Sequence, residues 1–365
     1  MIHKPMPIDF RLVIASLAIL VLGLAACFIT NDIKRNEYED QQYEAAVLMQ
    51  EAEAFLKADI LSRGIEMEAE DLNNTALIGP EFTELTTTPG AVDAKRTALN
   101  PNFAAAMIRY YCQAGLKEGD EIAVGTSGSF PGLAIAVVTS AKVMGLKAKV
   151  IASCGSSMHG ATRPEYTIFD MLLGLNENGF SDFELLAVSG GGPNDQGGGV
   201  LEGILFEGTA ELSQELCRKA ALRSKAELIS FDKLSDSIQR RLELYGDNIK
   251  LFINVGGAAP NEGTSSYTLS FPQGLVLTPP TIPEVENRGL NYEFAAKGLP
   301  VLNLLNVKLL ASQNGIAYDS VPLQSPGKGQ VYTTSSYSKP LMVLTIALSL
   351  SCLAIGLVIR RKKDK

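Results

Sequence analysis

Two apolar runs near the ends of the chain place the strongest constraint on its fold. They are LVIASLAILVLGLAACFIT (12–30) and LMVLTIALSLSCLAIGLVI (341–359), each 19 residues long and free of charged side chains. A helix needs roughly 20 apolar residues to cross the hydrocarbon core of a bilayer. The sequence therefore predicts transmembrane helices at 12–30 and 339–359.

The basic residues after the second run predict the orientation. Five of the six residues in RRKKDK (360–365) are Lys or Arg, and such residues gather on the cytoplasmic side of a membrane. Two spans leave both termini on one side. We therefore expect segment 1–11 and tail 360–365 in the cytoplasm, and residues 31–338 on the outer face of the cell (inner or plasma) membrane.

A lipoprotein anchor is the alternative for the N-terminus. The stretch Leu-Ala-Ala-Cys at 24–27 follows an apolar run and is similar to a lipoprotein cleavage box. In that case Cys27 carries lipid and the first helix is removed. Either interpretation leaves the main domain outside the cytoplasm.

The charge of the middle segment excludes one class of partner. Residues 31–338 hold 24 of the 32 Lys and Arg residues and 38 of the 40 Asp and Glu residues, so their formal net charge is −14. Nonspecific nucleic-acid binding depends on cations that neutralise phosphates. We therefore expect no nucleic-acid partner.

The middle segment divides into two parts. Residues 36–64 have apolar side chains at helical spacing and end at a glycine, which predicts a stalk helix. Turn signals in 64–101 indicate a connector. The sequence thus predicts a stalk helix and connector over 31–100 and an extracytoplasmic domain over 101–338.

Strands and helices alternate in the domain. Apolar strands are predicted at 121–127, 147–153, 183–189, 226–231 and 249–257, with helices at 102–115, 132–145, 166–179, 210–219 and 234–245. This alternation is typical of a mostly parallel sheet. We expect an α/β fold with a Rossmann-like sheet, helices on both faces, and the two transmembrane helices flanking it.

Small-residue loops follow four of these strands, at 125–132, 153–160, 190–199 and 256–263. The carboxyl ends of parallel strands share one edge of a sheet, and open α/β sheets bind ligands there. We expect the four loops to form a crevice.

The first loop, GTSGSFPG, matches neither the dinucleotide fingerprint, the P-loop nor the nucleophile elbow. It still offers the hydroxyls of Thr126, Ser127 and Ser129, with Gly128 between them, at the start of a helix. A helix start favours an anion, so these residues are candidates for ligand binding. Helix capping by the same hydroxyls is the alternative.

Catalytic candidates are few because the domain has one histidine, His159. A nucleophile needs an adjacent base, which makes Ser127 with His159 or Cys154 with His159 the possible pairs. The scattered cysteines imply neither a disulfide framework nor a zinc site. We predict no metal site, and the sequence indicates no particular cofactor.

Further ligand-binding candidates lie on the second and third loops. Arg163 suits a carboxylate, and Ser156 lies on the same loop. The stretch GGGPNDQGGG (190–199) surrounds one carboxylate with glycines that let a backbone approach a ligand closely. The candidates there are Gly191, Gly192, Asp195 and Gly198, and a turn-forming role for Asp195 is the alternative.

Several of these features together resemble one family. The chain resembles the membrane-anchored poly-gamma-glutamate system protein family. This resemblance rests on the two terminal spans around one domain and on three motifs, GTSGSFPGL, SSMHGATRPEYTIFDM and SGGGPNDQGGG. The resemblance implies a role in the synthesis, export or anchoring of poly-gamma-glutamate, with the membrane subunits of its synthase or exporter as partners. It implies no established reaction.

Two functions follow from the sequence. The first is an accessory protein of poly-gamma-glutamate synthesis, export or anchoring that binds a small anionic ligand or the polymer end at its glycine and serine loops. The second is an extracytoplasmic hydrolase or transferase acting on γ-glutamyl amide bonds, with Ser127 or Cys154 as the nucleophile. The shortage of bases favours the accessory protein.

Overall fold

The computed structural model describes residues 10–30, 32–336 and 338–363. Most of the expected segment 1–11 and the last two residues of the basic tail lie outside them. The chain divides into two compact units, one formed by 38–332 and the other by 1–37 together with 333–365.

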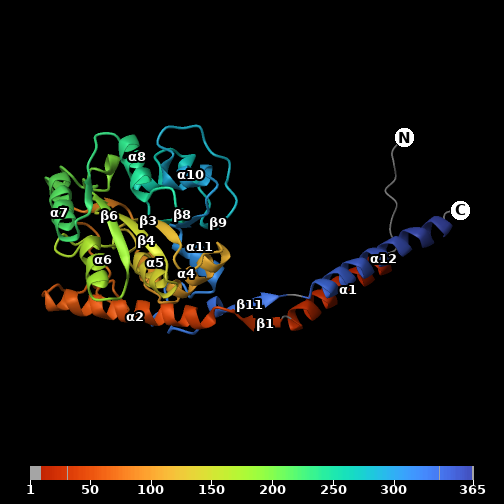
Figure 1. Cartoon of the computed structure of the whole chain (residues 1–365). Coiled ribbons are helices and arrows are strands. Elements are labelled where there is room, and N and C mark those ends of the chain that lie inside the picture. Colours follow the sequence, from red (N-terminus) through yellow and green to blue (C-terminus); the bar gives the residue numbers. More distant parts are fainter. Residues whose placement is uncertain (1–9, 31, 337, 364–365) are drawn as a thin grey trace. The chain divides into compact units, whose positions relative to one another are not determined.

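A seven-stranded sheet forms the centre of the 38–332 unit, in the order β7-β6-β4-β3-β8-β10-β9 (Figure 1). All neighbouring strands are parallel except β9 and β10. The strands are β3 (Glu121–Ser127), β4 (Lys147–Ser153), β6 (Phe183–Ser189), β7 (Glu227–Ile229), β8 (Ile249–Val255), β9 (Gly274–Val276) and β10 (Val301–Leu304). The predicted mostly parallel α/β sheet is confirmed, and β9 and β10 extend it.

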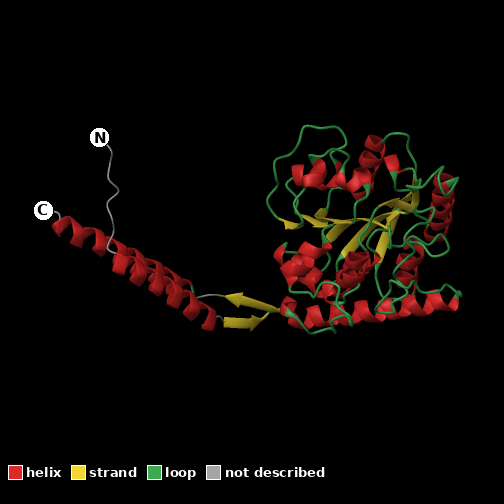
Figure 2. Cartoon of the chain, turned by 180° about the vertical axis from the view of Figure 1, so that it is seen from behind, coloured by secondary structure: helices red, strands yellow, loops and turns green. Residues whose placement is uncertain are grey.

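Helices cover both faces of the sheet (Figures 1 and 2). Because side chains alternate along a strand, Ile122 and Val124 of β3 enter one hydrophobic core while Ala123 enters the other. The first core holds side chains of α2 (Glu39–Ser62), α3 (Val92–Ala98), α4 (Asn102–Gln113), α5 (Pro131–Val143), α6 (Ile168–Glu177), α7 (Thr209–Ser224) and α11 (Val307–Asn314). The second holds side chains of α8 (Leu234–Tyr245) and α10 (Gly289–Ala296).

The helix expected as a stalk, α2, belongs to the compact unit. It packs against α4 and α5 through a row of buried apolar side chains, namely Ala45, Ala46, Met49, Ala52, Leu56 and Ile60. These small and medium side chains recur at helical spacing and form a continuous contact face. The helix is therefore present as predicted, but it covers the domain.

Short elements complete the unit. They are β2 (Thr86–Thr88), β5 (Ser156–Ser157), α9 (Ala259–Glu262) and the 3₁₀ turns Pro193–Asp195, Thr268–Ser270 and Gln330–Tyr332. Strands β2 and β5 pair in parallel. This pairing fixes part of the expected connector beside the loop that follows β4.

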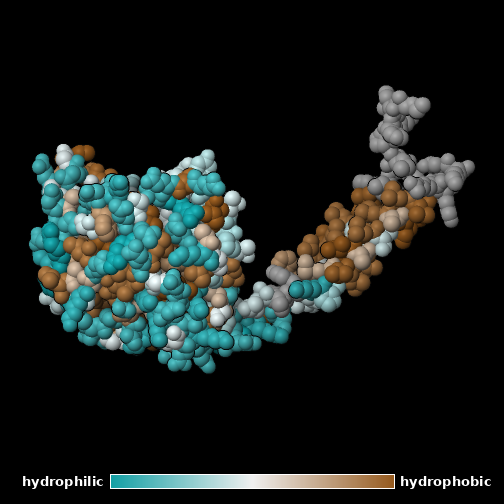
Figure 3. All heavy atoms as spheres, turned by 45° about the horizontal axis from the view of Figure 1, so that its top comes forward, coloured by the Kyte–Doolittle hydropathy of each residue, from teal (hydrophilic) through white to brown (hydrophobic). Residues whose placement is uncertain are grey.

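The second unit contains α1 (Phe10–Ile29) and α12 (Lys339–Lys363), which pack against each other, and the antiparallel strands β1 (Asp32–Arg35) and β11 (Thr333–Ser336). Residues 11–29 and 339–359 are long and apolar enough to cross a membrane. Hydrophobic side chains cover the visible face of the helix pair (Figure 3). Two candidate membrane spans are thus present where the sequence predicted them.

Candidate functional site

A cavity of about 340 Å³ lies at the carboxyl ends of the central strands. Chain order along the sheet reverses between β3 and β8, because β4, β6 and β7 extend it on one side of β3 and β8 lies on the other. In open α/β sheets ligands bind at such a reversal, outside the carboxyl ends of the strands. The cavity therefore occupies the position where this architecture favours a ligand.

All four predicted loops contribute to the wall. The wall includes Ser127 at the end of β3 with Ser129 and Phe130 after it; Ser153 at the end of β4 with Gly155 and Ser157 after it; Gly191, Gly192 and Pro193 after β6; and Gly257, Ala258 and Ala259 after β8. Two further parts come from the segment expected as a connector. These are Thr87 and Thr88 of β2 with Pro89 and Gly90 after them, and Lys95 on α3.

Glycines let the third loop lie directly against the second. Gly191 and Gly192 have φ values of +71° and +65°, which side chains disfavour. A Cβ on Gly191 would lie 2.8 Å from the backbone nitrogen of Gly155. The glycine-rich stretch is thus a tight turn whose backbone forms one wall of the cavity.

Lys95 is the ionisable side chain in the lining. It is 3% exposed, and its Nζ lies 2.6 Å from Ser157 Oγ and donates to the carbonyl oxygen of Ser129. The ring of Phe130 lies under the amine, 3.7 Å from Nζ to the ring centre. Burial disfavours the charged form and lowers the pKa of Lys95 from its usual 10.5 to about 7.

Backbone contacts fix Ser157 beside this amine. Strand β5 is held by β2, with Thr88 opposite Ser157, and Met158 donates its N–H to the Thr88 carbonyl at 3.0 Å. The N–H of Ser157 also donates to Ser129 Oγ at 3.1 Å. Ser129 therefore contacts both members of the pair, Lys95 through its carbonyl and Ser157 through its hydroxyl.

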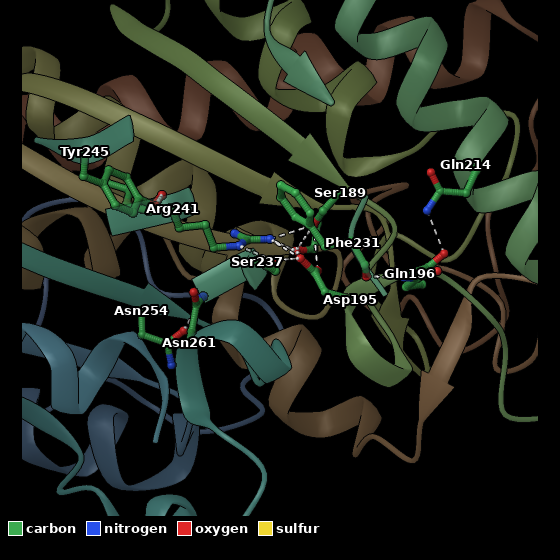
Figure 4. Close-up of polar contacts among 12 residues, drawn as sticks. Ser189, Asp195, Gln196, Gln214, Phe231, Ser237, Arg241, Tyr245, Asn254 and Asn261 are labelled. Atoms are coloured by element: carbon green, nitrogen blue, oxygen red, sulfur yellow. Dashed lines mark hydrogen bonds and ion pairs between the residues drawn. The ribbon is translucent and has the colours of Figure 1, made fainter. Parts of the chain in front are cut away.

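Asp195 is not part of the described cavity lining, and its carboxylate belongs to a buried polar cluster (Figure 4). Its carboxylate accepts from Ser189 Oγ at 2.7 Å and from Ser237 Oγ at 2.6 Å, and it pairs with Arg241 at 2.8 Å. Asn194 and Asp195 have φ values of +51° and +66° in a 3₁₀ turn, and Asp195 is buried. Its contacts suit a structural role better than ligand binding.

The other candidates separate into two groups. Ser127, Ser129, Gly191 and Gly192 line the cavity. Thr126, Gly128, Cys154, Ser156, His159, Arg163 and Gly198 do not belong to its described lining. Arg163 forms a salt bridge with Glu68, with 2.9 Å between Arg163 Nη2 and Glu68 Oε1.

In the described part of the chain, His159 is hydrogen-bonded to neither Ser127 nor Cys154. The backbone N–H of His159 donates to the Pro80 carbonyl, while the ring Nδ1 of His159 has no hydrogen-bond partner among the described residues. Cys154 is fully buried and lies against Cys217, whose pKa is raised by that neighbour and by burial. Ser127 has access to the cavity, whereas Cys154 does not line it.

A second buried polar cluster lies on α9, next to the cavity wall at Ala259. Glu262 Oε1 accepts from Asn254 and, at 2.8 Å, from Asn291 Nδ2. Burial raises the pKa of Glu262 to about 7. The cluster thus holds a carboxyl group whose neutral form is favoured.

Among the described residues, no group of three or more His, Cys, Asp or Glu side chains is placed to hold a metal ion.

Lys95 and Ser157 are the functional candidates that the sequence did not reveal. Lys95 stands in VDAKRTAL beside Arg96, and nothing local distinguishes it from a solvent-facing lysine. The weak signal was the apolar character of its neighbours Val92, Ala98 and Leu99, which indicates a helix packed into the domain.

No family model, no curated protein and no solved structure matches this chain.

Proposed function

We propose that this chain is a membrane-anchored protein that binds a small carboxylate-bearing ligand in the cavity between its glycine and serine loops. One observation carries the proposal: Lys95 is the single ionisable group in the described lining, whose other polar side chains are hydroxyls and which also includes glycines and apolar side chains such as Phe130 and Leu305. An amine among hydroxyls and backbone N–H groups is suited to a carboxylate. The reversal of strand order beneath the cavity supports a ligand at this position.

The charge of the surrounding segment favours a local site over a broad surface. Residues 31–338 have a net charge of −14, which repels a long polyanion. A single amine inside a cavity accepts one carboxylate or one chain end. On the strength of the motif resemblance, we propose that this ligand is a γ-glutamyl chain end and that the protein assists the synthesis, export or anchoring of poly-gamma-glutamate.

The terminal helices support a membrane location for this function. We propose that both candidate spans cross the membrane, with both termini in the cytoplasm and unit 38–332 outside. The five basic residues at 360–365 support this orientation. A tag after Lys365 is then inaccessible from outside intact cells, and labelling of that tag from outside would contradict the orientation.

Ligand binding is tested on the full chain in detergent. Binding to the folded state raises the unfolding temperature. We expect glutamate and di- or tri-γ-glutamate to raise it, and more strongly at pH 6 than at pH 9 because Lys95 is protonated at the lower pH. Inorganic phosphate distinguishes a general anion site from a carboxylate site.

Two lysine variants show whether the effect belongs to the cavity. Lys95→Met removes the amine from the lining, whereas Lys142→Met removes an amine on α5 that contacts the Gly179 carbonyl. We expect the ligand-induced shift to disappear in the first variant and to remain in the second. Equal shifts in both variants, or none with wild type, would contradict the proposal.

A further inference from the structure

We infer that Lys95 and Ser157 form a general-base and nucleophile pair that transfers an acyl group from a carboxylate-bearing amide bound in the cavity. The choice of amide rests on the proposed function. The pair itself rests on the contact between the two side chains. It differs from both nucleophiles that the sequence suggested, Ser127 and Cys154.

The contact geometry suits proton transfer. Lys95 Nζ lies 2.6 Å from Ser157 Oγ, within the reach that a base needs. A neutral amine has two N–H groups and one lone pair. One N–H donates to the Ser129 carbonyl, and this leaves the lone pair to accept the proton of Ser157.

The buried surroundings of Lys95 favour the neutral form of its amine. Lys95 is buried, and its pKa of about 7 reflects that burial. The face of Phe130 attracts the ammonium form, but burial outweighs it. Besides Lys95, the charged or titratable residues on α3 and on the two helices packed against it are Asp93 and Arg96 on α3, Lys308 on α11 and Lys142 on α5, and His159 follows β5. No ion pair among the described residues includes Lys95, and Arg96 pairs with Asp319.

Other hydroxyls in the cavity are less suited to attack. Ser153 Oγ is bonded to Ser189 Oγ at 2.9 Å and belongs to the Asp195 cluster. Ser127 Oγ accepts from the N–H of Ser129 at 3.4 Å, and the amine contacts Ser157 instead. Ser157 is therefore the hydroxyl with a base beside it.

The chemistry balances with water as the only co-reactant. Ser157 Oγ bonds to the amide carbonyl carbon as its proton passes to Lys95 Nζ. The C–N bond then breaks, and the Lys95 ammonium gives that proton to the departing amine. Water attacks the resulting ester while Lys95 accepts its proton. The ester C–O bond then breaks as the Lys95 ammonium returns that proton to Ser157 Oγ, which restores the hydroxyl and the neutral amine and releases a carboxylic acid. An amine acceptor in place of water gives transfer instead of hydrolysis.

The test begins with covalent labelling of the full chain in detergent by a fluorophosphonate, which reacts with activated serines. We expect one adduct, mapped to Ser157 by mass spectrometry. The labelling rate should rise with pH through about 7 and then level, as Lys95 loses its proton. At saturating substrate, the kcat for cleavage of γ-glutamyl p-nitroanilide should follow the same profile.

Substitutions distinguish a loss of labelling caused by removing the pair from one caused by misfolding. Ser157→Ala should abolish labelling, and Lys95→Met should lower its rate by about 100-fold or more. Ser224→Ala and Lys142→Met alter residues outside the cavity and should retain the wild-type rate. Because Lys95→Met changes a buried residue, circular dichroism and the unfolding temperature verify that each variant is folded. The pH profile of wild type tests the base without any substitution.

The outcomes distinguish this inference from the proposed function. If γ-glutamyl peptides raise the unfolding temperature but Ser157 is neither labelled nor needed for amide cleavage, the pair is refuted and the binding function stands. If Ser157 is labelled with the expected pH profile but γ-glutamyl peptides do not bind, the pair stands and the ligand assignment fails. Labelling at another serine, or a rate independent of pH between 5 and 9, also refutes the pair.

Discussion

Arg241 Nη2 lies 2.8 Å from Asp195 Oδ2, and the two side chains are 0% and 1% exposed. Arg241 comes from α8 and Asp195 from the loop after β6, and Ser189 Oγ bonds to both of them. This ion pair joins the glycine-rich loop to the helix that covers one face of the sheet. It gives the carboxylate in that loop a structural explanation.

Asp195→Ala should therefore destabilise the protein. Removing one partner of a buried ion pair leaves an uncompensated charge and costs about 3–5 kcal/mol. Chemical unfolding of the full chain in detergent measures the change. Asp182→Ala, at an exposed position, should change the unfolding free energy by less than about 0.5 kcal/mol.

Although Asp195→Ala should lose stability, its folded fraction should still bind the ligand. We expect the ligand-induced shift in unfolding temperature to persist, because Asp195 faces the cluster with Arg241. A stable Asp195→Ala protein that has lost ligand binding would instead support the ligand role that the glycine neighbours suggested.

Five of the seven strands of the sheet could be predicted because each of them is locally marked. Residues 121–127, 147–153 and 183–189 are short, mostly apolar runs that end in small residues, and each is followed by a loop and a helix. A strand buried on both faces reads as such a run. The parallel arrangement then follows from the alternation, and with it the edge where the loops meet.

The lining of the cavity could be predicted only in part because side-chain direction is not a local property. The alternation of strands and helices placed Ser127 and Gly191 at the edge of the sheet where the parallel strands end. Whether a residue faces the cavity depends on contacts with distant segments, such as the pairing of β2 with β5. The same dependence hid Lys95, which lies 62 residues before its partner Ser157.

Lys95 should give the protein a distinctive dependence of stability on pH. Its pKa falls from 10.5 in the unfolded chain to about 7 in the folded one, so between these values the unfolded state binds more protons. Stability from this group then rises with pH, by up to about 4–5 kcal/mol between pH 7 and 10.5. Unfolding free energies of wild type and Lys95→Met, measured across this range, should converge as pH rises. Parallel curves would show that burial does not depress the pKa of Lys95.

Glu262 should have the opposite effect at lower pH. Its pKa rises from 4.5 to about 7 on folding, so between these values the folded state binds more protons. The stability from this group is present below pH 4.5 and is lost as pH rises through 7, by about 3 kcal/mol. Glu262→Gln keeps the shape and the bonds to Asn254 and Asn291 without the charge. It should stabilise the protein at pH 8 and have little effect at pH 4.5, whereas Glu284→Gln should match wild type at both. A destabilising Glu262→Gln at pH 8 would mean that the carboxylate is needed there.

Gly23 should be needed for the pairing of the two candidate membrane spans. A Cβ on Gly23 of α1 would lie 2.1 Å from Thr345 Cγ2 of α12, and farther along the pair Ser16 Oγ and Ser349 Oγ are 2.7 Å apart. Small residues let membrane helices approach closely enough to pack and to hydrogen-bond.

With Ser16→Cys and Ser349→Cys in one chain, oxidation in native membranes should cross-link α1 to α12. Adding Gly23→Leu should remove most of this cross-link by separating the helices, whereas Ala25→Leu, on an exposed side of α1, should preserve it. Full cross-linking in the Gly23→Leu chain would show that the close approach at Thr345 does not hold the pair together.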